Sequence, residues 1–412
     1  MTLLTGTVIA KLIPLLFSPF LTRIFSPEDF GIYGLMYSFT TVLTVVICGR
    51  YESSILLPEK DEDADSLLIL GFLIAFVVLF VLIFSVSFFS DNIAQMINSR
   101  EFSRYLPALP WIVFITGVTS LFAYWFNRKA QYGTITVKRI TESVASFSSQ
   151  LIFGLVGFLS WGLIFGRIVG VSVSFLYFSF KYFKTVKTGI TFNIKKMLDN
   201  AVRYRRFPLY LVPGHLLNTI SMQIPVFLFA SFFSSSVVGF YTFTYRIAYT
   251  PMSVIGKSIE TVFRQRAAEQ YNQKGHFHDL FKSVFLRLFS FSVVPFVIFA
   301  FSAPFLFSVF FGDEWREAGE YAKILSVMFF FQFITTPLTA TFVILERQDL
   351  ELYWQIFRFV AAVGSIFTGY YITGDAGATL WFFSIFFSLI YLTALIVTYM
   401  LSKEKQKKGE KL

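Results

Sequence analysis

The feature that most constrains this chain is a run of 24 residues, Ser66 to Phe89, without one charged side chain. About 20 apolar residues in a helix cross the roughly 30 Å hydrocarbon core of a bilayer, so this run is long enough to span a membrane. Similar runs recur along the whole chain, and only 15% of its 412 residues are charged. A soluble domain carries about a quarter. The sequence therefore predicts a polytopic membrane protein rather than a cytosolic enzyme.

Twelve apolar stretches are candidate transmembrane helices, and none shows the alternation of a transmembrane strand. They are residues 5–25, 31–49, 66–89, 106–126, 141–159, 161–180, 207–233, 237–256, 283–303, 319–344, 352–373 and 378–401. Only Ser160-Trp161-Gly162 interrupts 141–180, where we expect a tight turn because one helix of that length would far exceed the bilayer. The first stretch has no cleavage site after a short apolar core, so we interpret it as a span rather than a signal peptide. The predicted fold is all-α.

Basic residues predict the orientation of these spans. The loops after even-numbered spans, with the C-terminal tail, contain 25 Lys and Arg, whereas the loops after odd-numbered spans contain five. Basic loops face the cytoplasm, so we expect both termini there. Topology and contact with membrane lipid thus explain most of the net charge of +10, and no nucleic-acid partner is predicted.

An internal repeat divides the chain. Gly31-Ile32-Tyr33 opens the second span and Gly239-Phe240-Tyr241 opens the eighth, an offset of 208 residues. Prolines and basic-plus-Gln clusters also recur at matching places, in the pairs Pro14/Pro19 with Pro213/Pro225, and 127–131 with 346–348. The predicted domains are an N-terminal lobe at 1–180, a basic linker at 181–206, a C-terminal lobe at 207–401 and a basic tail at 402–412. Broken helices at equivalent positions favour a transporter, the alternative being that prolines are simply common in membrane helices.

Three motifs resemble one known family. They are Leu12-Ile13-Pro14 with Leu21 to Gly31, Gly49-Arg50-Tyr51-Glu52 with Leu57-Pro58 and the acidic stretch ending at Asp65, and Phe311 to Gly319. The chain resembles bacterial oligosaccharide flippases of the Wzx type, which serve O-antigen and lipopolysaccharide synthesis. The resemblance implies the fold of multidrug exporters and the lipid II flippase, with two six-helix lobes around a central cavity. It also implies a bacterial inner-membrane location, other polysaccharide-assembly membrane proteins as partners, and an undecaprenyl-pyrophosphate-linked oligosaccharide that passes from the cytoplasmic to the periplasmic leaflet.

Charged residues inside the spans are the candidate binding groups, because a charge at a helix centre costs about 2.5–3.5 kcal/mol on insertion scales. Five are basic and one, Glu142, is acidic. The basic ones are Lys11, Arg167, Arg246, Arg287 and Arg358. An anionic head group such as pyrophosphate fits this excess of cations.

We predict substrate-binding roles for Lys11, Arg246 and Arg358, and for Arg23 and Arg50 within the family motifs. The alternative is that these cations snorkel to the interface or pair at helix contacts. Arg287 is expected to be interfacial. Arg167 lies in a Gly-x-x-x-Gly pattern and is expected to be structural.

Other polar groups have simpler interpretations. Glu28 and Asp29 are expected to cap the second span, and the acidic run Glu59 to Asp65 is expected to be a solvated face. Polar and aromatic residues of the seventh and eighth spans are candidate sugar contacts, namely Asn218, Gln223, Tyr241, Tyr245 and Tyr249. The 56 Phe residues fit either lipid-facing bulk or a compositional bias.

The sequence predicts no cofactor, no metal site and no enzyme. One cysteine and three histidines leave little for metal or nucleophilic chemistry, and no phosphate-binding glycine loop or hydrolase motif occurs. Alternating access would then draw on an ion gradient, the membrane potential or consumption of the product. One alternative is an ion-coupled drug exporter of the same fold, which needs membrane-embedded carboxylates. Another is a polymerase or ligase of lipid-linked sugars, which needs larger outer loops than 90–105 and 304–318.

Overall fold

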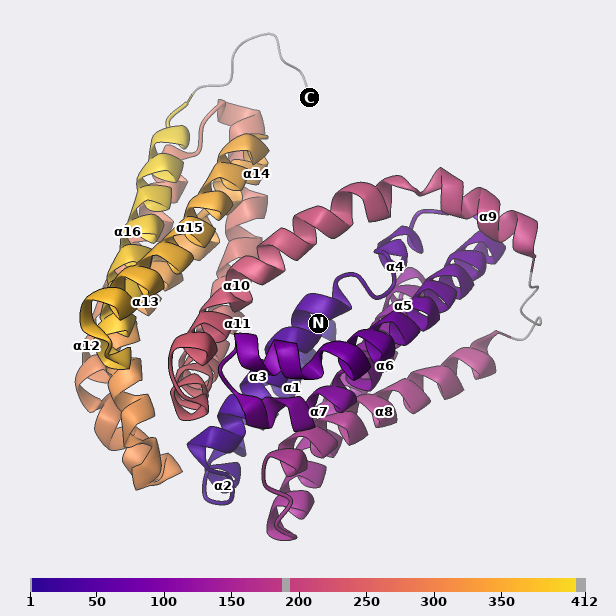
Figure 1. The fold of residues 1–412 in the computed structure, drawn as a ribbon. Helices are drawn as coiled ribbons and strands as arrows, with labels where there is room; N and C mark the ends of the chain where they lie inside the picture. The colour runs from indigo at the N-terminus through magenta and orange to yellow at the C-terminus, as the bar shows by residue number, and fades with distance from the viewer. Residues whose placement is uncertain (1, 187–192, 405–412) are drawn as a thin grey trace. The chain divides into compact units, whose positions relative to one another are not determined.

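The computed structural model describes residues 2–186 and 193–404, and the elements within them are helices without strands (Figure 1). The all-α prediction is therefore confirmed. The predicted tail at 402–412 lies mostly outside the described residues.

Helices occupy all twelve predicted spans. The first half contains α1 (Thr2–Leu16), α2 (Ser18–Leu21), α3 (Pro27–Thr44), α4 (Tyr51–Ser54), α5 (Asp61–Met96), η1 (Arg100–Arg104), η2 (Leu106–Ala108), α6 (Leu109–Arg128), α7 (Tyr132–Leu155) and α8 (Leu159–Thr185). The second half contains α9 (Ile194–Arg203), η3 (Phe207–Leu211), α10 (Val212–Phe232), α11 (Ser235–Lys274), α12 (His278–Phe311), η4 (Asp313–Trp315), α13 (Arg316–Leu338), α14 (Ala340–Ile344), α15 (Gln348–Thr373) and α16 (Ala376–Leu401).

Eight helical segments of the described chain are long and apolar enough to cross a membrane. The other predicted spans coincide with α1–α2, α3, α7 and α11, which are helical but shorter or more polar. In α7 the cause is the charged group Lys138, Arg139 and Glu142. Because charged side chains are costly in lipid, we expect such helices to turn these residues toward protein or water.

The turn between the fifth and sixth spans lies earlier than predicted. The chain reverses at Val156–Phe158, where Gly157 adopts a φ of 89° that favours glycine. Ser160, which the sequence suggested as part of the turn, instead lies in the first turn of α8 and donates a hydrogen bond to Asp29 Oδ1 at 2.5 Å. A glycine in the left-handed region breaks the helix more effectively than the small polar residues that follow it.

Two compact units make up the chain, residues 1–239 and 240–412. The first unit extends past the basic linker because α10 packs against α3, where Ser38 Oγ donates to Gln223 Oε1 at 2.8 Å. These units therefore do not coincide with the predicted lobes at 1–180 and 207–401, which stay a prediction.

A reciprocal glycine contact in the first unit supports the internal repeat. A Cβ atom at Gly31 would overlap the carbonyl oxygen of Ser235, and a Cβ at Gly239 would overlap that of Pro27. Both pairs are related by the 208-residue offset that the sequence indicated. Exchange of equivalent residues across a contact is the mark of a two-fold relation. The start of α3 and the start of α11 thus meet about a local two-fold axis, with backbones too close for any side chain.

Turns with positive φ recur at equivalent loops of the two halves. The matching positions are Gly49 and Arg50 with Gly275, Asn98 with Gly312, Ala130 with Glu346, and Gly157 and Leu159 with Gly374. The ends of α6 and α14 also share one hydrogen bond, from Gln131 N to Phe126 O at 2.9 Å and from Arg347 N to Phe342 O at 2.8 Å. This bond is typical of a helix that ends in a left-handed residue. The two halves therefore reverse direction by the same local geometry.

Phenylalanines serve both surface and core. On α5, Phe76, Phe80, Phe84 and Phe88 recur every four residues and are all exposed. The equivalent α12 exposes Phe291, Phe301 and Phe305, whereas Phe126, Phe178 and Phe229 are buried. A stripe of exposed aromatic residues on a membrane-spanning helix suits contact with lipid tails. Part of the Phe content thus lies exposed on α5 and α12, where it suits contact with lipid, and part lies in the core.

Candidate functional site

Lys11 lies exposed on α1, about one turn before Pro14, which lies inside this helix near its end. Pro14 has no N–H to donate to the carbonyl of Ala10. Ser143 Oγ of α7 donates to that carbonyl at 3.0 Å, and Ser18 Oγ donates to the carbonyl of Pro14 at 2.5 Å. The carbonyls of Ala10 and Pro14 on either side of Lys11 are therefore satisfied by side chains of the protein.

Arg23 is exposed in the turn between α2 and α3. The turn is rigid because Ser26 and Asp29 form a capping box, with Ser26 N donating to Asp29 Oδ2 at 2.9 Å and Asp29 N to Ser26 Oγ at 3.2 Å. The predicted capping role of Asp29 is confirmed. Arg50 lies beyond the other end of α3, whose 18 residues measure about 27 Å. One head group cannot contact Arg23 and Arg50 at the same time.

Arg50 forms an ion pair with Glu52 rather than standing alone. Gly49 and Arg50 both have positive φ, and the tight turn brings Arg50 Nη1 to 3.3 Å from Glu52 Oε1. Burial raises the pKa of Glu52, against the opposing effect of Arg50. Arg50 Nε and Glu52 Oε2 are buried without a hydrogen-bond partner. The pair is therefore incompletely satisfied, with one donor of Arg50 and one acceptor of Glu52 buried and unused.

Glu142 neutralises two cations inside the first unit. Its two carboxylate oxygens lie 2.5 Å from Lys138 Nζ and 2.7 Å from Arg167 Nη1. Close packing of α7 on α8 brings these groups together, since a Cβ at Gly170 would overlap Ser146 Oγ. Arg167 is thus held by a carboxylate of the neighbouring helix, in agreement with the structural role expected for it.

Arg246 and Arg358 belong to the second unit and lie in α11 and α15. Both are partly buried, and neither makes a salt bridge within the described residues. The Arg358 guanidinium lies over the Trp354 ring at 5.0 Å, and its Nε is buried without a hydrogen-bond partner. A ring face attracts a cation but offers no acceptor to its N–H groups. The Nε donor of Arg358 is therefore unsatisfied within the described residues.

Aromatic residues surround Arg358, and we call the group the tyrosine cluster. Its members come from α11, α15 and α16 and are Tyr241, Tyr245, Tyr249, Trp354 and Tyr391. The three α11 tyrosines recur every four residues, with ring centroids 6.0 Å and 4.9 Å apart. The Trp354 and Tyr391 rings are 6.0 Å apart, and Arg358 interacts electrostatically with Tyr249 and Tyr391. The second unit thus combines an unpaired cation with aromatic faces and phenolic hydroxyls.

Two residues of this neighbourhood were missed by sequence reasoning. Gln332 Nε2 donates to Tyr245 Oη at 3.5 Å while its Oε1 is buried without a partner, and Tyr391 is buried in the tyrosine cluster. The sequence signal that could have identified Gln332 is that it is the one Gln in the apolar helix α13. Among the predicted sugar contacts, Gln223 is bonded to Ser38 and Tyr241 is buried, whereas Asn218 and Tyr249 are partly exposed.

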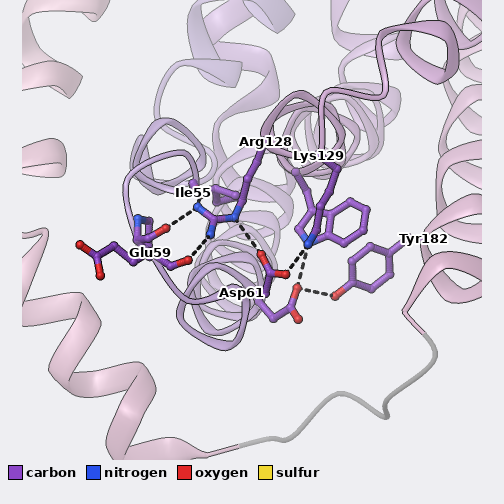
Figure 2. Close-up of polar contacts among 9 residues, drawn as sticks. Ile55, Glu59, Asp61, Arg128, Lys129 and Tyr182 are labelled. Atoms are coloured by element: carbon purple, nitrogen blue, oxygen red, sulfur yellow. Dashed lines mark hydrogen bonds and ion pairs between the residues drawn. The ribbon is translucent and has the colours of Figure 1, made fainter.

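The acidic run Glu59 to Asp65 is partly the solvated face that the sequence suggested, since Glu59, Asp61 and Glu62 are exposed, but it also contacts distant helices. Arg128 donates to the carbonyls of Ile55 at 3.3 Å and Glu59 at 3.1 Å, and both Arg128 and Lys129 pair with Asp61 (Figure 2). Asp65 Oδ1 accepts from Trp125 Nε1 at 2.8 Å and from Tyr182 Oη at 3.2 Å.

These contacts come from the ends of α6 and α8, which lie far from the run in the sequence. Composition alone could not reveal them. Through these contacts the run also links α5, α6 and α8 at one end of the first unit.

The fold defined by these helices is that of a membrane transporter. Over 98% of this chain and 94% of the other, it matches an inward-facing multidrug resistance transporter of the MATE family, with a TM-score of 0.73 and 16% identity. The fold also matches the lipid II flippase MurJ over 97% of this chain and 89% of MurJ, with a TM-score of 0.72 and 14% identity. A MOP-superfamily transporter from Pyrococcus furiosus matches over 98% and 93%, with a TM-score of 0.60 and 12% identity. These relatives are transporters and a flippase rather than enzymes.

The family follows from the sequence match. Residues 20–320 match the family of polysaccharide biosynthesis proteins, and the chain belongs to this family. No curated protein sequence matches the chain. The resemblance found in the three sequence motifs is therefore confirmed at the level of the family and of the superfamily fold, and the chain is a multi-pass membrane protein of that class.

Proposed function

We propose that this protein is a flippase that moves an undecaprenyl-pyrophosphate-linked oligosaccharide from the cytoplasmic to the periplasmic leaflet of a bacterial inner membrane. Membership in the polysaccharide biosynthesis family supports a lipid-linked sugar as the cargo. The cargo would serve O-antigen or lipopolysaccharide synthesis, and its direction follows from the synthesis of such precursors inside the cell. Alternating access between two lobes would carry it, with both termini in the cytoplasm.

The observation that carries this proposal is the balance of charge within the spans. Glu142 in the fifth predicted span pairs with Lys138 and Arg167, and Glu320 at the start of the tenth pairs with Lys323. Arg246 and Arg358 have no carboxylate partner among the described residues. An unpaired cation within a membrane is costly and is retained where a ligand or cavity compensates it. A pyrophosphate would accept the free N–H groups, and Arg grips such groups through two parallel hydrogen bonds.

The same balance argues against a drug or cation exporter. That chemistry needs a membrane carboxylate that is free to exchange a cation or a proton. Glu142 is held by two cations, and Asp29 is held by its capping box and Ser160. A polymerase or ligase is disfavoured because the outer loops are short, with Ile97–Ser99 before η1 and Gly312 before η4 as the irregular segments.

Reconstitution tests the proposal directly. Purified protein in proteoliposomes is supplied with a labelled undecaprenyl-pyrophosphate oligosaccharide, and a membrane-impermeant sugar-modifying enzyme probes the far leaflet. We expect protein-dependent appearance of the sugar on that side. If no more sugar is modified in the far leaflet than in empty vesicles, the flippase assignment is wrong. Turnover in detergent, where no compartment exists, would favour an enzyme.

Variants test the proposed binding residues. We expect Lys11→Ala, Arg246→Ala and Arg358→Ala each to lower transport at least about tenfold, because each removes a charge-assisted contact worth about 1.5–3 kcal/mol. Arg287→Ala is the matched control, since Arg287 is an exposed basic residue of the spans. Arg23 and Arg50, at opposite ends of α3, are expected to act at opposite ends of the transport path. Wild-type rates for all of the first three variants would remove this site assignment.

A further inference from the structure

The linker helix α9 has two faces of different character. In a helix, residues four apart lie one above the other on one face. Ile194, Leu198 and Val202 form such a stripe and are all more than half exposed, at 56%, 55% and 63%. Lys196 and Asn200 lie on the opposite side. An apolar stripe left open on a ten-residue helix needs a partner, because water would otherwise cover it at a cost.

The opposite face docks α9 onto α5. Lys196 Nζ lies 2.7 Å from Glu62 Oε2 and 3.3 Å from Asp63 Oδ1. Buried Asn200 donates through Nδ2 to Ser66 Oγ at 2.7 Å, and Tyr51 Oη donates to the carbonyl of Ala201 at 3.0 Å. Figure 1 shows α9 lying at the end of α5 beside α4. The docked face thus fixes the position of the helix within the first unit.

The docking point sets the depth of α9 relative to the membrane. Ser66, which Asn200 contacts, is also the first residue of the uncharged 24-residue run of α5. The chain leaves one membrane-spanning helix at Thr185 and enters the next at Phe207, so both ends of the linker belong to the same side. The helix is therefore held at the level where hydrocarbon gives way to head groups, with its stripe directed away from α5.

The charges beside the stripe select the partner. Lys195 and Arg203 of α9 are exposed, and Arg205 and Arg206 follow in the turn before η3. Asp199 is the one exposed acid of the helix. A helix with an apolar stripe and basic flanks binds in the plane of a membrane interface, and each basic residue near an anionic surface contributes about 1 kcal/mol.

We propose that α9 is an interfacial helix, whose stripe Ile194–Leu198–Val202 inserts among the lipids while its basic flank contacts anionic phospholipid head groups. The linker between the two halves is then anchored twice, to α5 through Lys196 and Asn200 and to the leaflet through the stripe. This assignment does not depend on the transported cargo.

The test places an environment-sensitive fluorophore on either side of α9. Cys48 is the one cysteine of the chain, so Cys48→Ala provides the background. Leu198→Cys places the label on the stripe, and Asp199→Cys is the matched control on the polar side of the same turn. The labelled full-length proteins are reconstituted in phosphatidylcholine vesicles, with or without phosphatidylglycerol, and quenching by lipids brominated near the head group is measured.

We expect strong quenching of the label at position 198 and little at position 199, with a further increase when phosphatidylglycerol is present. Adding Lys195→Glu and Arg203→Glu should abolish that increase. Equal quenching at both positions would overturn insertion of the stripe, and equal quenching in both kinds of vesicle would overturn the selection of anionic lipid. A signal that follows the protein-to-lipid ratio without bromolipid quenching would mean that a second copy covers the stripe.

Discussion

At the residue scale, the charges within the spans fall into paired and unpaired groups. Lys138, Arg167 and Arg50 each have a carboxylate partner, whereas Arg246 and Arg358 have none within the described residues. Paired charges hold helices in register, and removing one partner leaves the other buried without compensation. Unpaired charges have no such partner to lose, and we propose that they serve a ligand. The two groups should therefore respond differently to substitution.

The Glu142 ion pairs are expected to stabilise the first unit. Glu142→Gln should lower the free energy of unfolding by about 3 kcal/mol, because Arg167 and Lys138 stay partly buried without a counter-charge. Thermal unfolding of the purified protein in detergent measures this loss. Combining Glu142→Leu with Arg167→Leu and Lys138→Leu should recover stability. Additive losses in the combined variant would contradict the ion-pair interpretation.

The stability contributed by Glu52 should depend on pH. Its pKa is raised above 4.5 by burial, so the folded protein binds this proton more tightly than the unfolded chain does. The contribution of Glu52 to the free energy of unfolding is therefore fully present below about pH 4.5. It is lost as the pH rises through the pKa of Glu52 in the folded protein. Glu52→Gln should remove this fall. Melting temperatures of the two proteins across the range from pH 4 to 8 should converge at low pH, and parallel curves would refute the prediction.

At the element scale, the contact between α3 and α11 depends on two equivalent glycines. Their backbones approach so closely that a methyl group at either position overlaps a carbonyl oxygen of the other helix. Helix pairs in membranes commonly associate through such small residues. The loops also show that the two halves are equivalent, because each turn with a positive φ in one half has a counterpart in the other.

Gly31→Ala and Gly239→Ala should each destabilise the protein by about 1–3 kcal/mol, since the helices must move apart to admit the methyl group. Gly364→Ala in α15 is the control, because nothing lies within 4 Å of its added Cβ. That control should be neutral or gain up to about 1 kcal/mol from higher helix propensity. Melting temperature and yield of folded protein in the membrane fraction measure both effects.

At the scale of the whole molecule, the distribution of basic loops predicts which ends of the helices face the cytoplasm. On the Cys48→Ala background, Asp199→Cys in the linker should react with impermeant maleimide only after the membrane is opened. Arg104→Cys, before α6, should react in intact cells, because its loop is predicted to be periplasmic. Both sites lie on exposed residues of the first unit. The opposite labelling pattern would invert the topology and, with it, the proposed direction of transport.

The sequence by itself determined the spans, their order, the repeat and the family. Hydrophobicity, helix length and motif spacing are local properties, so Ser66–Phe89 already predicted α5, and the 208-residue offset already predicted that Gly31 and Gly239 are equivalent. The sequence placed Asp29 at a helix cap for the same reason, because a capping box needs only four consecutive residues.

Only the tertiary structure decided which charges are neutralised by a carboxylate and which are not. Arg167 and Glu142 are 25 residues apart in the sequence, and Arg128 and Asp61 are 67 apart. No periodicity in the sequence therefore indicates either ion pair. Ion pairing requires atoms within about 4 Å, and helix packing alone brings distant residues that close. The same packing brings Trp125 and Tyr182 to Asp65 at the end of the partly exposed acidic run, and it places Arg358 over Trp354 with its Nε buried and without a hydrogen-bond partner.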